Sequence, residues 1–523
     1  MRLAVAGAWM IQAALLVLGC KEEVLETTLV RLPDAASDTD GGVRPTQDDA
    51  VPAGLVGTRV EAGVESGVAE REVGGARAVA DAGVSGKKAE LGEGDGSIPS
   101  AMTMRELDAL AGRVAAHRVP IVHPERLKRA FAALRKLSKK RRKGTTNIVV
   151  LGDSHIAADY VTRTVRRRLQ DRFGDAGRGF VAIDQRVHFG GRRLGRRGFT
   201  RARIVDRRGP GQPFGFAGMS ITSLRRDAKA FYEVEPEDRA LWVYYESYPR
   251  GPRVRVNLAS KRVGRFSTRS RRRQTRRFRI ALPKSAHPPS RPHVDNGDAP
   301  LPSDPRRIFD EALQLVAEGS GAKLYGLSFE TGNPGVLLHS VGPVGADAKV
   351  YLGYDRRSLR EHLKLVDPKL LVIWLGGNDA LAVRKGRRSL ATVKDQYQRM
   401  LRMFRELLPD VDCLLWAPMD AGERLSTTAA SKRGREGASA TDDRDGPIVS
   451  KSKIVEVRDI VREVAETAGC AYWDTFQAMG GEGSFGRWFN EGMMNDDLIH
   501  PREVGGELLG HLAATAIEDA MAR

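Results

Sequence analysis

The sequence of 523 residues has few of the residues that bind metals or build disulfide frameworks. It contains three cysteines and ten histidines, and no group of His, Cys and Asp stands at the spacing of a metal site. We therefore predict that the protein binds no metal and needs no cofactor. Cys413 and Cys470 lie in the hydrophobic segments VDCLLW and GCAYW, which fits buried thiols slightly better than a bridge and leaves a disulfide open.

Signatures of nucleic-acid binding are also missing, although the chain is strongly basic. Lys and Arg number 85 against 66 Asp and Glu, a formal charge of +19. Such a charge favours an anionic partner such as nucleic acid, acidic lipid or wall polymer. The basic residues are mostly Arg, are scattered along the whole chain, and form no helix-turn-helix, zinc-finger or RNA-binding motif. We therefore expect no nucleic-acid partner.

The amino terminus carries a short apolar run instead of a membrane-spanning one. Arg2 is followed by apolar residues from Leu3 to Leu18 and then by the sequence VLGC, which ends at Cys20. The run is too short for a stable transmembrane helix and resembles a bacterial lipoprotein signal peptide, residues 1–20. That resemblance implies lipidation of Cys20, a membrane anchor made of acyl chains, and a place in the cell envelope. An ordinary secretory signal is the alternative.

Aromatic residues are absent from 21–100, which is rich in Gly, Ala, Asp, Glu and Val and is predicted to be a disordered tether. Beyond it, apolar residues recur at helical spacing up to Leu137. Short apolar segments then alternate with helical stretches, a pattern typical of a parallel α/β sheet. The expected strands are listed here: 148–151, 370–375, 411–416 and 471–473.

The residue pattern changes between about 200 and 330, where segments of alternating apolar and polar residues are separated by loops rich in Gly, Pro and Arg. This pattern predicts a β-sandwich inserted into an α/β domain made of 101–199 and 331–523. Four aromatic residues of the insert could stack on sugar rings, although ordinary core packing is the favoured alternative for each one. They are Trp242, Tyr244, Tyr245 and Tyr248.

A serine follows the first strand of the α/β pattern. The segment 148–151 leads into Gly152-Asp153-Ser154-His155 and then into a helical stretch. Open α/β sheets place their sites at such strand ends, where free backbone N–H groups can receive an oxyanion. Ser154 is therefore a candidate nucleophile. A helix N-cap serine is the structural alternative for this tripeptide.

An aspartate and a histidine stand three residues apart near the carboxyl terminus, at Asp497 and His500. On a turn, this spacing lets the carboxylate hold one ring nitrogen while the other faces a distant serine. A chance pairing on a surface turn is common for so short a motif. Two further motifs follow apolar segments and strengthen the interpretation: GGND at 376–379 and GPVGA at 342–346.

Serine, glycine, asparagine and histidine blocks in this order resemble the SGNH (GDSL-like) hydrolases. The resemblance covers about 146–185 and 325–520, and it implies a flavodoxin-like three-layer α/β fold. It further implies that Ser154 attacks an ester carbonyl, that His500 acts as base and then acid, and that Asp497 orients His500. The oxyanion would be held by the N–H groups of Ser154 and Gly345 and by the side chain of Asn378, with Gly342 as the alternative to Gly345.

A narrower resemblance is to bacterial peptidoglycan O-acetylesterases that carry an inserted carbohydrate-binding-like module. It rests on the GDSH block, its continuation to Tyr160, the insert, and the segment 473–481. The implied function is removal of O-acetyl groups from peptidoglycan or a related envelope polysaccharide, through an acetyl-Ser154 intermediate. The alternatives are an O-acetyltransferase with the same triad, a non-catalytic wall-binding lipoprotein, and a lipase or thioesterase. His155 replaces the leucine of the GDSL name, and a local structural hydrogen bond is its expected role.

Overall fold

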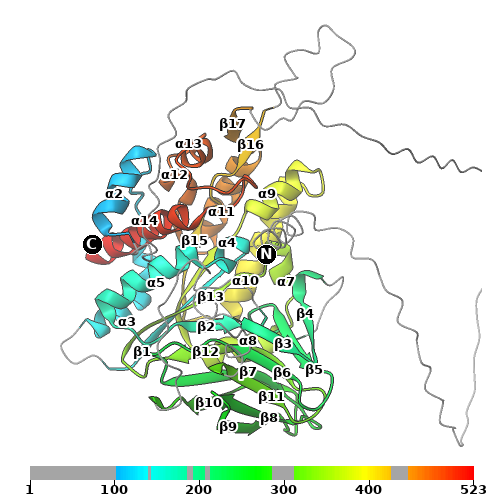
Figure 1. Cartoon of the computed structure of the whole chain (residues 1–523). Helices are drawn as coiled ribbons and strands as arrows, with labels where there is room; N and C mark the ends of the chain where they lie inside the picture. The colour runs from blue at the N-terminus through cyan, green and yellow to red at the C-terminus, as the bar shows by residue number, and fades with distance from the viewer. Residues whose placement is uncertain (1–101, 139–142, 185–192, 207–212, 285–310, 426–445) are drawn as a thin grey trace, which may run out of the picture. The chain divides into compact units, whose positions relative to one another are not determined.

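The computed structural model describes residues 102–138, 143–184, 193–206, 213–284, 311–425 and 446–523 (Figure 1). The predicted signal peptide, Cys20 and the predicted tether lie outside these residues. Nearly all of 426–446, whose small and charged residues predict a surface loop, also lies outside them. No helix in the described ranges is long and apolar enough to cross a membrane.

A five-stranded parallel sheet forms the centre of the α/β part. Its strands are β1 (Thr145–Gly152), β13 (Gly335–Val341), β14 (Pro368–Trp374), β15 (Asp412–Trp416) and β18 (Ala471–Trp473). They lie in the order β13-β1-β14-β15-β18, and every neighbouring pair is parallel. Counted within this sheet alone the order is 2-1-3-4-5, the flavodoxin-like arrangement. The predicted fold class is therefore confirmed.

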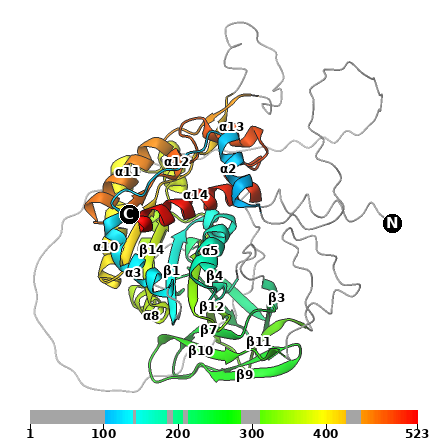
Figure 2. The ribbon, with the colours of Figure 1, turned by 90° about the vertical axis from the view of Figure 1, so that its left-hand side faces the viewer.

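Helices cover both faces of this sheet, because alternate residues of each strand point to opposite sides. Val149 and Leu151 of β1 belong to one hydrophobic core, whereas Ile148 and Val150 belong to the other. The first core is shared with α8 (Arg356–Val366), α10 (Leu390–Leu407) and α11 (Ile454–Thr467). The second is shared with α2 (Met104–Arg113), α3 (Lys128–Leu137), α5 (Tyr160–Phe173) and α14 (Glu503–Ala522), and α14 lies along α5 (Figure 2). These layers place the carboxyl ends of the strands at one edge, where the site lies.

Two antiparallel sheets are inserted between β1 and β13. The first has the order β10-β7-β12-β5-β4 with β2 also paired to β12, and the second has the order β3-β6-β11-β8-β9. The bounds are β2 (Gly179–Ala182), β3 (Arg193–Arg197), β4 (Phe199–Arg203), β5 (Met219–Ser223), β6 (Lys229–Tyr232), β7 (Ala240–Ser247), β8 (Arg253–Leu258), β9 (Lys261–Ser267), β10 (Gln274–Ala281), β11 (Leu313–Ala317) and β12 (Lys323–Glu330). Antiparallel pairing thus begins at Gly179, before the expected boundary at 200, because β2 pairs with the distant strand β12.

The aromatic residues of the insert have protein partners. Tyr244 and Tyr245 are buried in a core that is continuous with one side of the parallel sheet, so they are not available to a sugar. The Arg277 guanidinium lies 4.1 Å from the centre of the Trp242 ring. Tyr248 donates its hydroxyl hydrogen to the carbonyl of Gly321 at 3.0 Å. For the two buried tyrosines, the core-packing alternative is correct.

Cys413 and Cys470 form a disulfide, so the slight preference for free thiols was wrong. Cys413 lies in β15, and Cys470 directly precedes β18, the neighbouring parallel strand. Adjacent parallel strands bring residues at the same level together, and the two Cα atoms are 4.9 Å apart. The local hydrophobic context could not show this, because the pairing depends on the strand order.

Candidate active site

The nucleophile block is a sharp turn from β1 into a short helix, α4 (Ser154–Ala157). Its N-cap is Asp153, whose carboxylate accepts a hydrogen bond from the His155 N–H at 3.0 Å. Ser154 is therefore the first residue of the helix, and the alternative of an N-cap serine was wrong. A side chain at Gly152 would lie 2.7 Å from the Trp374 carbonyl oxygen, so the turn requires glycine here. Within the described structure the Ser154 backbone N–H has no acceptor.

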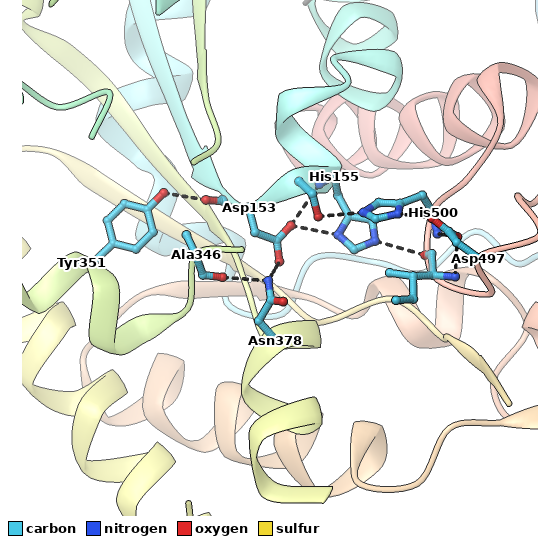
Figure 3. Close-up of polar contacts among 10 residues, drawn as sticks. Asp153, His155, Ala346, Tyr351, Asn378, Asp497 and His500 are labelled. Carbon is cyan, nitrogen blue, oxygen red and sulfur yellow. Dashed lines mark hydrogen bonds and ion pairs between the residues drawn. The ribbon is translucent and has the colours of Figure 1, made fainter. Parts of the chain in front are cut away.

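Ser154, His500 and Asp497 lie in one line of hydrogen bonds (Figure 3). The Ser154 hydroxyl lies 2.7 Å from Nε2 of His500, and Nδ1 of His500 lies 2.6 Å from Oδ2 of Asp497. The turn that carries Asp497 and His500 is closed by its own backbone, because Oδ1 of Asp497 accepts from the N–H groups of Ile499 and His500, each at 2.9 Å. Leu498, between them, has a left-handed backbone with φ of 58°. The three predicted triad residues are thus brought together.

The Asp497 carboxyl group is held in its ionised form. Its partial burial raises its pKa, but hydrogen bonds from the His500 ring and from the backbone N–H groups outweigh burial and lower the pKa to about 2. An ionised carboxylate on Nδ1 fixes the tautomer that leaves Nε2 free to accept the serine proton. This arrangement suits His500 to accept a proton from Ser154.

Asn378 lies beside the nucleophile turn, at the start of α9 (Gly377–Arg384). Its amide nitrogen donates to Oδ2 of Asp153 at 3.2 Å and to the Ala346 carbonyl at 2.9 Å. Both amide hydrogens therefore have protein acceptors. Donation to an oxyanion, the predicted role of Asn378, requires it to share or release one of these bonds.

The two candidate glycines of the second block differ in their surroundings. A side chain at Gly342 would collide with the Asp153 carbonyl and would lie 2.8 Å from the Ala157 nitrogen, so this glycine allows close packing under the nucleophile turn. Gly345 is exposed, has φ of 81°, and sits in a turn closed by the Ala346 N–H donating to the Pro343 carbonyl at 2.9 Å. Gly345 directly precedes Ala346, whose carbonyl accepts a hydrogen bond from Asn378, whereas Gly342 packs against the residue before Ser154.

Behind Asn378 lies a buried charge network that the sequence did not reveal. Arg388 donates to Oδ1 of Asp379 at 3.0 Å and forms a second ion pair with Asp347, at the start of α7 (Ala348–Leu352). Burial, followed by the nearby Asp347 carboxylate, raises the pKa of Asp379 to about 7. Tyr351 of α7 donates to the Gly152 carbonyl at 2.6 Å (Figure 3). The second and third blocks are thus tied to the nucleophile turn.

A pocket opens beside Ser154, His155 and Asn378. Its wall is mainly apolar and includes Trp374, Leu381, Pro418, Met419 and Ile454, with Lys451 as its basic residue. No group of three or more His, Cys, Asp or Glu side chains in the described part of the chain is arranged to hold a metal ion. The site therefore offers a serine nucleophile, a base and a small apolar recess.

Comparison with known proteins places this site in a family. Residues 342–508 match the model of the GDSL-like lipase/acylhydrolase family. The match includes Gly345, Asn378, Asp497 and His500, and it begins after the inserted sheets that separate Ser154 from the rest. The chain carries an SGNH, or GDSL-like, hydrolase domain, as its four sequence blocks indicated, and it is an ester-hydrolysing enzyme.

The chain is also similar to solved structures, one of which shares its fold over most of its length. A structure described as a peptidoglycan O-acetylesterase in action is 19% identical, with a TM-score of 0.56 over 75% of this chain and 96% of that chain. An acetyl xylan esterase is 17% identical, with a TM-score of 0.25 over 35% of this chain and 81% of that chain. A family 3 carbohydrate esterase from Talaromyces cellulolyticus is 17% identical, with a TM-score of 0.22 over 36% of this chain and 72% of that chain. No curated protein matches the sequence.

Proposed function

We propose that the protein is a carbohydrate O-acetylesterase that removes acetyl groups from peptidoglycan or a related envelope polysaccharide. The observation that carries this proposal is the line of hydrogen bonds from Ser154 through His500 to Asp497, beside a small apolar pocket. A likeness of fold to a peptidoglycan O-acetylesterase supports it, because that likeness covers 75% of the chain and so extends well beyond the family-matched residues.

The residues would act in two steps. Ser154 Oγ adds to the acetyl carbonyl carbon while His500 Nε2 takes the hydroxyl proton. The resulting oxyanion accepts a hydrogen bond from the Ser154 backbone N–H. The C–O bond to the sugar then breaks, and His500 returns its proton to the departing sugar oxygen. Water attacks acetyl-Ser154 in the same way, with His500 again taking and returning the proton, and acetate leaves. Gly345 and Asn378 would supply the other oxyanion donors.

The test is acetate release from O-acetylated peptidoglycan, measured beside hydrolysis of 4-nitrophenyl acetate. We expect the full chain to release acetate in both assays and its Ser154→Ala variant to do so in neither. If wild type cleaves the small ester and leaves the polymer intact, the polysaccharide part of the proposal is wrong. If both forms bind the wall polymer and neither cleaves an ester, the protein is a wall-binding lipoprotein. Acetyl transfer to an added sugar, with little free acetate, would identify a transferase.

We also propose that lipid on Cys20 anchors the enzyme in the cell envelope, with residues 21–100 as the tether. The short apolar run and the VLGC sequence support this proposal. Metabolic labelling with a fatty acid should mark the wild type and spare the Cys20→Ala variant, which should leave the membrane fraction. Equal labelling of both forms would contradict the anchor.

A further inference from the structure

A buried pair of residues flanks the nucleophile on both sides. Asp153 is 2% exposed and His155 is 9% exposed. Nδ1 of His155 lies 2.8 Å from Oδ1 of Asp153, and Nε2 lies 3.2 Å from the carbonyl oxygen of Ile499, inside the turn that carries the triad (Figure 3). The pair is therefore more than a local contact, because it joins the nucleophile turn to a segment more than 300 residues away.

The partners of the His155 ring show which protons it carries. A carboxylate oxygen and a carbonyl oxygen accept hydrogen bonds and donate none, so both ring nitrogens must donate. That requires the imidazolium form. Burial lowers the pKa of His155, but the Asp153 carboxylate and the Ile499 carbonyl raise it overall. The Asp497 carboxylate acts in the same direction, and the remaining rings that face His155 are those of Trp374 at 5.4 Å and His500 at 5.0 Å.

We propose that His155 is a cationic positioning residue for the esterase reaction, and this inference rests on the function proposed above. Asp153 accepts a hydrogen bond from the side-chain amide of Asn378, so the negative charge of Asp153 lies next to the expected position of the oxyanion. An uncompensated buried carboxylate there opposes the negative charge of the tetrahedral intermediate. His155 balances that charge. Through its contact with Ile499, it also holds the turn that carries Asp497 and His500 against Ser154.

The main experiment is a double-mutant cycle on 4-nitrophenyl acetate hydrolysis with His155→Leu, Asp153→Asn and the double variant. His155→Leu should lower kcat by about 10- to 100-fold with little change in KM, since the charge acts in the transition state. The acid limb of its pH profile should move to higher pH, because the unpaired Asp153 carboxylate adds negative potential at the catalytic site. The double variant should recover part of kcat and return the limb toward the wild-type position.

Two controls keep the outcomes distinct. Thermal unfolding of each variant shows whether it is folded, and His155→Gln serves as a second, polar variant in case His155→Leu does not fold. In the wild type, ¹⁵N NMR at pH 8 should show two protonated ring nitrogens on His155. An unshifted limb in His155→Leu, a double variant no better than the single one, or a neutral His155 ring would overturn the proposal. Absence of Ser154-dependent turnover in the wild type would overturn the proposed function instead, and the NMR result would still decide the charge.

A second, independent feature is a lysine in the active-site pocket. Lys451 directly follows β17 (Ile448–Ser450), lines the otherwise mainly apolar pocket, and is half-buried. No carboxylate of the described residues forms an ion pair with it. Burial lowers the pKa of its ammonium, the nearby Arg384 and Lys385 lower it further, and the Asp497 and Asp420 carboxylates only partly oppose this. A half-buried ammonium without an ion-pair partner is suited to a ligand anion.

We infer that Lys451 binds a carboxylate on the sugar that carries the acetyl ester. An acetyl group has no charge, so under the proposed function the anion must belong to the alcohol part of the ester. The substrate class would then be an acetylated acidic sugar. Nearby Arg384, which is paired with Glu423, and exposed Lys385 add positive potential at the same side of the pocket.

The test compares kcat/KM for 6-O-acetyl N-acetylmuramic acid and 6-O-acetyl N-acetylglucosamine, which differ by a lactyl carboxylate. Wild type should favour the acidic sugar by about tenfold, as expected for a hydrogen bond to a charged group. Lys451→Gln should lose this preference, Lys451→Arg should keep most of it, and Lys364→Gln, on the exposed side of α8, should behave as wild type. A preference that survives in Lys451→Gln, or no preference in the wild type, would overturn the inference. Failure on both sugars with normal 4-nitrophenyl acetate turnover would contradict the carbohydrate part of the proposed function.

Discussion

The parallel sheet and the inserted antiparallel sheets differ in where most of their charged side chains lie. At the carboxyl edge of the parallel sheet, buried polar groups bind one another across distant segments: Asp153 contacts Asn378 and His155, and Arg388 joins Asp347 to Asp379. In the insert, residues 253–284 contain thirteen Lys and Arg and no Asp or Glu. Most of these basic side chains are exposed, and the insert's interior is mainly apolar and aromatic, with a few buried carboxylates such as Asp238 and Glu246 that pair with arginines.

This difference indicates that different interactions dominate in the two parts of the molecule. Polar groups removed from water must be matched in number and geometry, and such matched networks fix the positions that catalysis requires. Exposed charges contribute little to stability, so the insert is held by its core. A substitution in the first region should change chemistry more than folding, and one in the second should do the reverse.

The largest effect should come from Asp497→Asn. The variant keeps the size of the side chain and loses the charge that fixes the His500 tautomer, so kcat on 4-nitrophenyl acetate should fall by about 10⁴-fold. The melting temperature should fall only modestly, because the amide oxygen of Asn can still accept from the Ile499 and His500 N–H groups. A loss of less than tenfold would mean that Asp497 does not orient the base.

Phe180→Ala should give the opposite result. Phe180 is fully buried on β2 and packs against Phe216, with ring centres 4.5 Å apart, and against His362 of α8. Removing the ring should cost about 3–5 kcal/mol of unfolding free energy in a denaturant titration. At temperatures where the variant is folded, kcat/KM should stay within about twofold of wild type. A larger loss of activity would show that the insert helps to shape the site.

Removing the disulfide tests the parallel part without touching its polar network. The bond closes a loop of 57 residues, so replacing both Cys413 and Cys470 by Ala should lower the unfolding free energy by about 2–4 kcal/mol. Cys413 and Cys470 lie at the start of their strands, away from the catalytic edge, and kcat should therefore be unchanged. A changed kcat would mean that strand position at one end controls geometry at the other.

The last test of the comparison concerns pH and Asp379. Its pKa is about 7 in the folded protein and near its ordinary value of 3.8 in the unfolded chain, so the folded state binds this proton more tightly. The resulting stabilisation is present below about pH 4 and is lost as the pH rises through 7. The melting temperature of wild type should thus fall between pH 5 and pH 8 relative to that of Asp379→Asn. Parallel curves would show that Asp379 stays ionised throughout.

Much of the parallel part was predictable from the sequence, because its signals are local. Buried apolar strands ended directly at GDSH, GPVGA and GGND, and parallel strands bring their carboxyl ends to one edge. That reasoning placed Ser154, Asn378 and the second-block glycines together. The Asp497 to His500 spacing also described its own turn, since the contacts that close it lie within three residues.

The rest depended on contacts that no local pattern encodes. The pairing of β2 with β12 joins segments about 145 residues apart, so the start of the antiparallel sheets could not be read from alternation alone. The disulfide depended on strand order in the same way. His155 was expected to make only a local hydrogen bond, and its second partner, Ile499, lies at the other end of the domain. No sequence motif marks Lys451, because a single lysine gives no pattern that distinguishes it from other surface lysines.

The distance along the chain between nucleophile and base has a consequence for biosynthesis. Ser154 and His500 are 346 residues apart, and the whole insert is translated between them. A nascent polypeptide that ends before residue 500 carries the serine without its base and cannot form the acyl-enzyme efficiently. Hydrolytic competence therefore arises only late in synthesis, after the turn 497–500 has been made and has packed against the nucleophile turn.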